Sequence, residues 1–213
     1  MFLQPHTTPA ESGWAGILPA GLAFTQAVHE CRAPEHTAGH AAFAAVLLAK
    51  LGETTPVLWV SANPCLYPPG LAWLGLNPAR CLFAHAKNDA ESLGTLEVAL
   101  RGGMAGVAEC GELSRLAARR LALAARQGGS TGFLLRYAPA TTSSDSTAFA
   151  TRWMISPLQG RGEMRLQAEL LYAKGGQPGV FVLDIHREAQ NGAAPFSLTL
   201  VPPGPAEQQR RTG

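Results

Sequence analysis

The feature that most constrains the fold is an alternation of short apolar runs and helix-like segments along the first two thirds of the chain. Short apolar runs of this kind are typical of strands buried on both faces of a sheet. Strands separated by helices favour right-handed crossovers, so we predict an α/β fold with a mostly parallel sheet and helices on both faces. The predicted strands are 22–31, 56–61, 80–85, 105–110 and 131–137, and the predicted helices are 37–51, 68–75, 89–101 and 112–127.

The alternation of strands and helices stops after residue 137. A polar loop over 138–147 precedes three further predicted strands, and Gly175–Gly176 favours an antiparallel hairpin between the last two. These strands are 149–155, 165–173 and 179–186. A length of 213 residues suits one domain. We therefore predict an N-terminal extension over 1–20, a single domain over 21–200 and a disordered tail over 201–213.

Composition narrows the class of protein. A formal net charge of +2 gives no general argument for nucleic-acid binding. The four cysteines are widely spaced, which favours buried free thiols over a disulfide framework. They are Cys31, Cys65, Cys81 and Cys110. The first 20 residues lack the basic start and apolar centre of a signal peptide, and no apolar run reaches the length of a membrane span. We therefore expect a cytoplasmic protein.

Residues 28–43 form a strand–loop–helix segment of the kind that carries a phosphate-binding loop, G-x-x-x-x-G-K-[ST]. Here Ala33 takes the place of the first glycine, and Gly39 can serve as the second only with one extra residue between them. His40 replaces the lysine that neutralises phosphate, and Ala41 replaces the hydroxyl residue that holds Mg²⁺. The segment predicts the position of a nucleotide site without its chemistry.

Several motifs in a consistent order carry a resemblance to a known family. They are V-H-E-C, P-V-L-W-V, G-L-A-W-L-G-L-N-P-A-R-C-L-F-A-H-A, R-R-L-A-L-A-A-R and A-T-R-W, and the similarity spans roughly residues 22–185. The chain resembles the ImuA family, the RecA- and SulA-related accessory proteins of bacterial mutagenic DNA repair. This resemblance implies a RecA-like three-layer fold that ends in an antiparallel hairpin.

The resemblance also implies which catalytic groups are absent. Compared with an active RecA-like ATPase, Asn63 stands where a glutamate would activate water, and Glu109 stands where an aspartate would organise Mg²⁺. Glu30, on the strand that enters the loop, keeps the residue type found at the matching position of an active RecA-like ATPase. We expect no catalytic residue, no cofactor and no enzymatic activity. Weak nucleotide binding stays open as an alternative, because a helix N-terminus attracts anions.

A zinc site near the loop is a second alternative. His36 and His40 are four residues apart, with Cys31 and Glu35 nearby, but these residues do not match a recognised ligand spacing. We therefore expect no metal, and we interpret the histidines as residues that fill the vacated phosphate site.

Two groups of residues are candidates for an interaction surface. Arg115, Arg119 and Arg126 recur at helical spacing on the predicted helix 112–127, whose apolar side is expected to hold Leu113, Leu116, Leu121 and Leu123. This stripe could bind an acidic partner or a phosphate backbone, or simply be solvated. Arg152 and Trp153 form the second group. The indole could stack on a base or lie in the core.

The family resemblance implies a non-catalytic role in the SOS response and translesion synthesis. Three partners are implied. The first is ImuB, which is a catalytically dead homologue of Y-family polymerases. The others are an error-prone replicative-type polymerase and RecA. A homo-oligomer and indirect or weak contact with DNA are further expectations. The alternatives are a SulA-like inhibitor of cell division and an ATP-dependent recombinase. The closing hairpin, Y-A-K-G-G-Q-P-G-V-F-V-L-D-I-H, departs from the Arg- and Asn-rich hairpin of its relatives.

Overall fold

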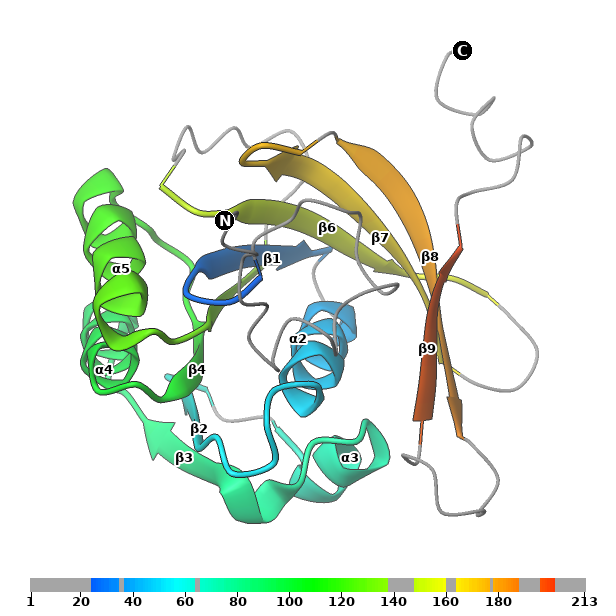
Figure 1. The fold of residues 1–213 in the computed structure, drawn as a ribbon, viewed down its shortest axis with the longest axis horizontal. Helices are drawn as coiled ribbons and strands as arrows, with labels where there is room; N and C mark the ends of the chain where they lie inside the picture. The colour runs from blue at the N-terminus through cyan, green and yellow to red at the C-terminus, as the bar shows by residue number, and fades with distance from the viewer. Residues whose placement is uncertain are drawn as a thin grey trace, which may run out of the picture.

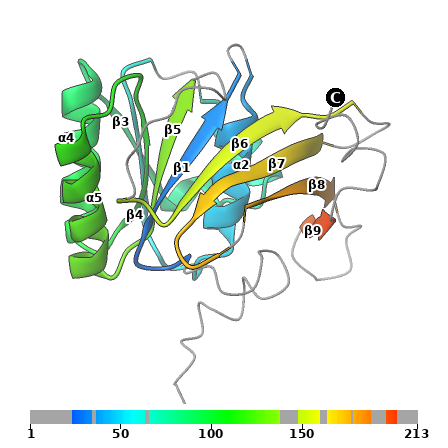
Figure 2. The ribbon, with the colours of Figure 1, turned by 90° about the horizontal axis from the view of Figure 1, so that it is seen from above.

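A computed structural model of the protein describes residues 24–34, 37–63, 66–137, 148–159, 164–176, 178–187 and 196–201. Nine strands make up one sheet: β1 (Val28–Ala33), β2 (Val57–Ser61), β3 (Cys81–His85), β4 (Ala105–Glu109), β5 (Gly132–Tyr137), β6 (Thr151–Pro157), β7 (Met164–Ala173), β8 (Gly179–Arg187) and β9 (Phe196–Val201). Their spatial order is β3-β2-β4-β5-β1-β6-β7-β8-β9 (Figures 1 and 2).

The sheet has a parallel part and an antiparallel part that meet at β6. Strands β3, β2, β4, β5, β1 and β6 are mutually parallel, whereas β7, β8 and β9 continue the sheet antiparallel. Gly175, with φ of 80°, lies in the turn between β7 and β8, where a left-handed backbone favours glycine. The predicted α/β architecture and closing hairpin are therefore confirmed.

Helices cover both faces of the parallel part. The helices α2 (Gly39–Ala49) and α3 (Pro68–Trp73) lie on one face, and α4 (Asp89–Arg101) and α5 (Arg115–Gly128) lie on the other. Figure 2 shows α4 and α5 as a layer beside the sheet, with α2 on the opposite side. A short 3₁₀ turn, η1 (Pro78–Arg80), leads into β3.

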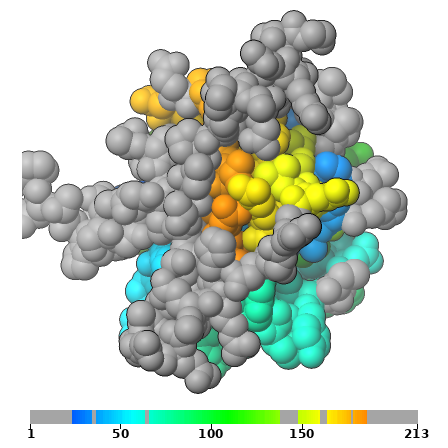
Figure 3. Space-filling view, turned by 90° about the vertical axis from the view of Figure 1, so that its right-hand side faces the viewer, coloured from blue at the N-terminus to red at the C-terminus, as the bar shows by residue number. Residues whose placement is uncertain are grey.

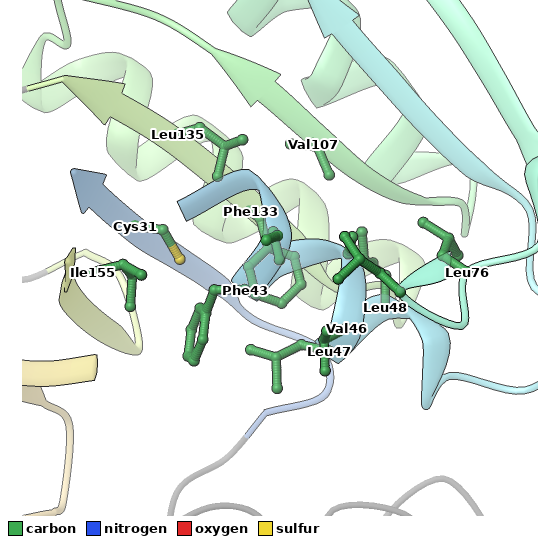
Figure 4. Packing of buried hydrophobic residues seen from close by; sticks show 14 of the residues in the cluster. Cys31, Phe43, Val46, Leu47, Leu48, Leu76, Val107, Phe133, Leu135 and Ile155 are labelled. Atoms are coloured by element: carbon green, nitrogen blue, oxygen red, sulfur yellow. The ribbon is translucent and has the colours of Figure 1, made fainter. Parts of the chain in front are cut away.

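Helix α2 is the centre of the larger core cluster. Its sequence, GHAAFAAVLLA, has no residue that is charged at neutral pH, and the curved sheet and α3 surround it (Figure 1). Phe43, Leu47 and Leu48 are fully buried. Figure 4 shows these side chains against Phe133 of β5 and Ile155 of β6. A helix that is apolar on nearly all sides belongs inside a protein rather than on its surface.

The outer helices have well-formed caps. The Asn88 side chain accepts a hydrogen bond from the Glu91 N–H (3.0 Å) at the start of α4, and Ser114 Oγ accepts one from the Ala117 N–H (3.1 Å) at the start of α5. Helix α5 therefore begins at Arg115, three residues later than predicted. It ends at Gly128, and the next residue, Gly129, has a φ of 63° and forms a left-handed C-cap.

The structure corrects the sequence prediction at the start of β1 and at the C-terminal end of the sheet. Strand β1 begins at Val28 rather than at residue 22, because Gln26 takes a φ of 57° that an extended strand cannot contain. Strand β9 was not predicted. Its last residue, Val201, had been assigned to the tail, but it pairs with Val182 of β8. The predicted extension over 1–20, the loop over 138–147 and the rest of the tail lie outside the described residues. No helix in the described part is long and apolar enough to cross a membrane.

Candidate functional site

The predicted nucleotide position lies at the C-terminal edge of the parallel strands, where α/β sheets usually bind ligands. Strand β1 ends there at Ala33 and α2 begins at Gly39, with Ala38 as the residue before the helix. Ala33, predicted in the loop, is the last residue of β1, because it pairs with Tyr137 of β5. Its place in the sheet, together with complete burial, removes it from the loop surface. Strand β1 thus ends two residues later than predicted, and the loop begins after Ala33.

The imidazole of His40 lies where the phosphate-binding lysine was expected. It is buried in the first turn of α2, and its ring centroid lies 4.7 Å from that of Tyr137 in an edge-on arrangement. Burial lowers its pKa to about 4, so the ring is neutral at pH 7. Nδ1 of His40 has no hydrogen-bond partner in the described part of the chain. The ring thus fills space at the helix start and supplies no positive charge.

Gly39 has a packing role at the same helix start. A Cβ atom at this position would lie 3.3 Å from Ile155 Cγ2 and 3.4 Å from Leu166 Cδ2. Helix α2 therefore approaches β6 and β7 closely at its first residue. Ala38 makes no side-chain cap, and Ala41 provides no hydroxyl. Among the described residues at this helix start, neither Ala38 nor Ala41 offers a side-chain ligand for phosphate or Mg²⁺.

Glu109, expected at the Mg²⁺-organising position, joins the ends of β4 and β2. Its Oε1 accepts a hydrogen bond from Trp59 Nε1, and its Oε2 accepts one from Ser61 Oγ, both at 3.0 Å. Ser61 Oγ in turn accepts a hydrogen bond from the backbone N–H of Asn63 at 3.0 Å. Both carboxylate oxygens are therefore engaged by protein donors, and Asn63 continues the same network.

A buried ion cluster around Glu30 lies beside this edge. The sequence analysis names Glu30 and Arg152 but does not predict that they meet in one cluster. The Glu30 side chain is 0% exposed, and its carboxylate accepts hydrogen bonds from Arg32 Nε (3.0 Å), Arg136 Nη1 (2.9 Å) and Arg152 Nε (2.7 Å). Burial alone would raise the pKa of this carboxyl, but the guanidinium groups of Arg152, Arg32 and Arg136 hold it below its ordinary value. Arg136 also donates from Nε and Nη2 to the Gly111 carbonyl.

An apolar cleft opens between the start of α2, the α3 region and the ends of β6 and β7. Its volume is about 630 Å³, and Ala38, Ala41, Tyr67, Leu71 and Leu166 are among the residues that line it. Figure 3 shows this side of the molecule, where the yellow surface of the β6 region lies beside the turquoise surface of the α3 region. The cleft beside the vacated nucleotide position is therefore mainly hydrophobic.

The structure separates the two predicted groups of surface residues. Arg115, Arg119 and Arg126 are exposed on α5, as the arginine-stripe hypothesis requires. Trp153 is fully buried, and its indole N–H donates to Thr151 Oγ1 (2.8 Å). Arg152 is 16% exposed and bound to Glu30. Trp153 is thus part of the core, and the base-stacking role is wrong because its ring has no solvent-facing side.

The cysteines and the alternative zinc site can be placed in part. Cys31 and Cys110 are buried and Cys81 is partly buried, and all three are free thiols. Burial raises the pKa of each of these thiols. Among the residues that the structure describes, no three His, Cys, Asp or Glu side chains converge as metal ligands. His36, Glu35 and Cys65 lie outside this part.

Comparisons with known proteins complete the description. The chain matches no protein-family model. The solved structure of SulA from Pseudomonas aeruginosa aligns with a TM-score of 0.44 and 26% identity, over 52% of this chain and 98% of that one. Protein ImuA from two strains of Caulobacter vibrioides is 34% identical over 206 residues, which are 87% of this chain and 80% of the relative. This identity confirms the resemblance predicted from the sequence motifs, and the protein therefore belongs to the ImuA family.

Proposed function

We propose that this protein is a non-catalytic, RecA-like accessory protein of DNA-damage-induced mutagenesis, acting in translesion synthesis during the SOS response. Membership of the ImuA family supports this role. The strand order of the parallel part, with α2 following β1 and two helices on the opposite face, supports the RecA-like assignment. The protein would act in the cytoplasm through contacts with other proteins.

The observation that carries the non-catalytic part is the filling of the nucleotide position. His40 is buried and neutral at the start of α2, and Glu109 is hydrogen-bonded to Trp59 and Ser61. Hydrolysis of ATP needs a cation on the phosphates, a bound Mg²⁺ and a group that activates water. The described residues around the start of α2 offer no such cation, no free Mg²⁺ ligand and no free group that could activate water. We therefore propose that the protein acts by binding other proteins.

The proposed partners are an ImuB-like homologue of Y-family polymerases, an error-prone replicative-type polymerase and RecA. Self-association is a further proposal. Strand β3 is an edge of the sheet, and its Leu82 and Phe83 side chains are exposed. Contact with DNA would be weak or indirect, since the net charge is only +2.

Nucleotide binding and hydrolysis test the non-catalytic part. We expect purified protein to show no saturable binding of ATP with Mg²⁺ and no phosphate release above the blank. The Glu109→Gln variant keeps the size of the side chain and removes its charge. Phosphate release by the wild type that disappears in Glu109→Gln, while both proteins melt at the same temperature, would contradict the proposal.

A deletion strain tests the biological part. Deletion of the gene is expected to lower the frequency of damage-induced mutations, and both the wild type and Glu109→Gln are expected to restore it. An unchanged frequency in the deletion strain refutes the mutagenesis role. Filamentation on overexpression, without an effect on mutation frequency, would instead identify an inhibitor of cell division.

A further inference from the structure

The outward face of α5 combines exposed leucines with arginines. Leu116 is 68% exposed and Leu123 is 55% exposed, whereas the inner side of the helix consists of Leu121 and small alanines. This corrects the sequence prediction, which placed both leucines on the buried side. Seven residues correspond to almost two helical turns, so Leu116 and Leu123 lie on one line about 10 Å apart along the axis.

The arginines are distributed unequally on the two sides of this leucine line. Arg120, on the α4 side, forms an ion pair with Glu97 (2.8 Å), which also binds Arg101 (2.7 Å). Arg119 and Arg126 lie on the other side, again seven residues apart, and are exposed. Neither forms an ion pair with a residue that the structure describes. Helix α5 carries four arginines and no acidic residue.

Helix stability does not explain this outer face. Alanine has a higher helix propensity than leucine, so an exposed leucine in an alanine-rich helix adds nothing to the helix itself. Arg115 places a positive charge in the first turn, where the helix dipole favours a negative one. Exposed leucines also have no use in binding a phosphate backbone, which is recognised by charge and hydrogen bonds.

We infer that Leu116, Leu123, Arg119 and Arg126 form a docking surface, the α5 surface, for an acidic amphipathic helix of a partner protein. The leucines would contact two apolar side chains of that helix, and the guanidinium groups would pair with flanking carboxylates. The inference rests on the proposed non-catalytic role, because it assigns the partner-binding activity to one face. Charge complementarity determines the class of partner: a helix rich in Asp and Glu rather than in Lys and Arg.

Fluorescence anisotropy with defined probes tests the inference on the full chain. The first probe is a labelled amphipathic peptide of about 20 residues, long enough to form a helix, with leucines at seven-residue spacing flanked by glutamates. The second has lysine in place of glutamate, and the third is a single-stranded oligonucleotide. We expect saturable binding of the acidic peptide alone. The double variants Leu116→Ala/Leu123→Ala and Arg119→Glu/Arg126→Glu are each expected to weaken it at least about tenfold.

Matched controls separate the α5 surface from general effects. Val98→Ala removes an exposed aliphatic side chain, 70% exposed, from helix α4, outside the α5 surface. Lys87→Glu/Lys174→Glu makes the same change of charge elsewhere on the surface. Both controls are expected to bind the acidic peptide like the wild type, and all variants are expected to keep the wild-type melting temperature, because the changed side chains are exposed.

Four outcomes would overturn the inference. The first is that the acidic peptide shows no saturable binding. The second is that both α5 variants bind it as the wild type does. The third is oligonucleotide binding that depends on Arg119 and Arg126 but not on the leucines. The fourth is a dimer in sedimentation experiments that Leu116→Ala/Leu123→Ala converts to a monomer, since a second copy would then occupy the surface. If the deletion strain still loses damage-induced mutagenesis, only the docking surface is refuted and the proposed function stands.

Discussion

Replacing Glu30 by glutamine tests whether the buried ion cluster stabilises the fold. In the wild type, Oε1 accepts hydrogen bonds from Arg32 and Arg136, and Oε2 accepts one from Arg152. Glutamine can keep one of these oxygens as an acceptor, but its NH₂ group cannot accept a hydrogen bond from a guanidinium. At least one charge-assisted bond is therefore lost, along with the negative charge that the three arginines share.

The expected loss of unfolding free energy is large. A charge-assisted hydrogen bond contributes about 1.5–3 kcal/mol, and removal of one partner from a buried ion pair costs about 3–5 kcal/mol. Because Glu30 is 0% exposed and Arg32 only 1%, water cannot replace the missing charge without rearrangement. We expect Glu30→Gln to lose about 3–5 kcal/mol, which lowers the melting temperature by about 6–20 °C in a domain of this size.

The pH dependence distinguishes a lost charge from a local packing defect. The pKa of Glu30 in the folded protein lies below its ordinary value of 4.5, so its contribution is fully present above pH 4.5. This contribution disappears as the pH falls through the lower folded-state pKa, where the wild type also binds the proton. The stability difference between Glu30→Gln and the wild type should therefore be largest near pH 7 and shrink below pH 4.5.

Urea unfolding followed by circular dichroism measures both quantities. The control is Glu53→Gln, which makes the same chemical change at an exposed position and should alter stability by less than about 0.5 kcal/mol. If Glu30→Gln unfolds within about 1 kcal/mol of the wild type at pH 7, or if the difference does not change with pH, the cluster does not stabilise the fold as argued.

Two further predictions concern buried histidines and close-packed glycines. His29 and His40 have folded-state pKa values of about 4 against 6.5, so unfolding free energy should fall as pH drops from 6.5 to 4, at up to about 2.7 kcal/mol per pH unit. His40→Leu should halve this slope in urea titrations near pH 5, and an unchanged slope would show that His40 titrates normally. A Cβ at Gly128 would clash with the Leu100 carbonyl oxygen, whereas one at Gly94 meets nothing within 4 Å. Thermal melts should show Gly128→Ala destabilised by about 1–3 kcal/mol and Gly94→Ala stabilised by about 0.5–1 kcal/mol, and equal effects would contradict the close packing.

Local patterns predict the order of strands and helices from β1 to β8, because buried strands, caps and turn glycines are encoded over a few residues. The predicted α4 boundaries match the structure at both ends. Strand β9 was missed, since its short run follows the Gly- and Ala-containing segment N-G-A-A-P and lies next to a polar tail. Its place is determined by pairing with β8.

The arrangement of side chains was harder to predict, because it depends on contacts between distant residues. The Glu30 cluster requires the register of β1 with β5 and β6, which brings together residues more than one hundred positions apart. Hydrophobicity alone places leucines inward on α5. The structure instead turns alanines inward, where small side chains let the helix pack closely. The contact of Gly128 with the Leu100 carbonyl shows how closely α5 approaches α4.

The Glu30 cluster has a consequence for how the sheet comes apart. Arg136 belongs to β5, Arg32 to β1 and Arg152 to β6, the strand next to the antiparallel part. If β6 separated from β1, the buried carboxylate would lose Arg152, one of its three guanidinium partners. Partial opening at this seam is therefore costly, and the parallel and antiparallel parts should unfold together as one cooperative unit.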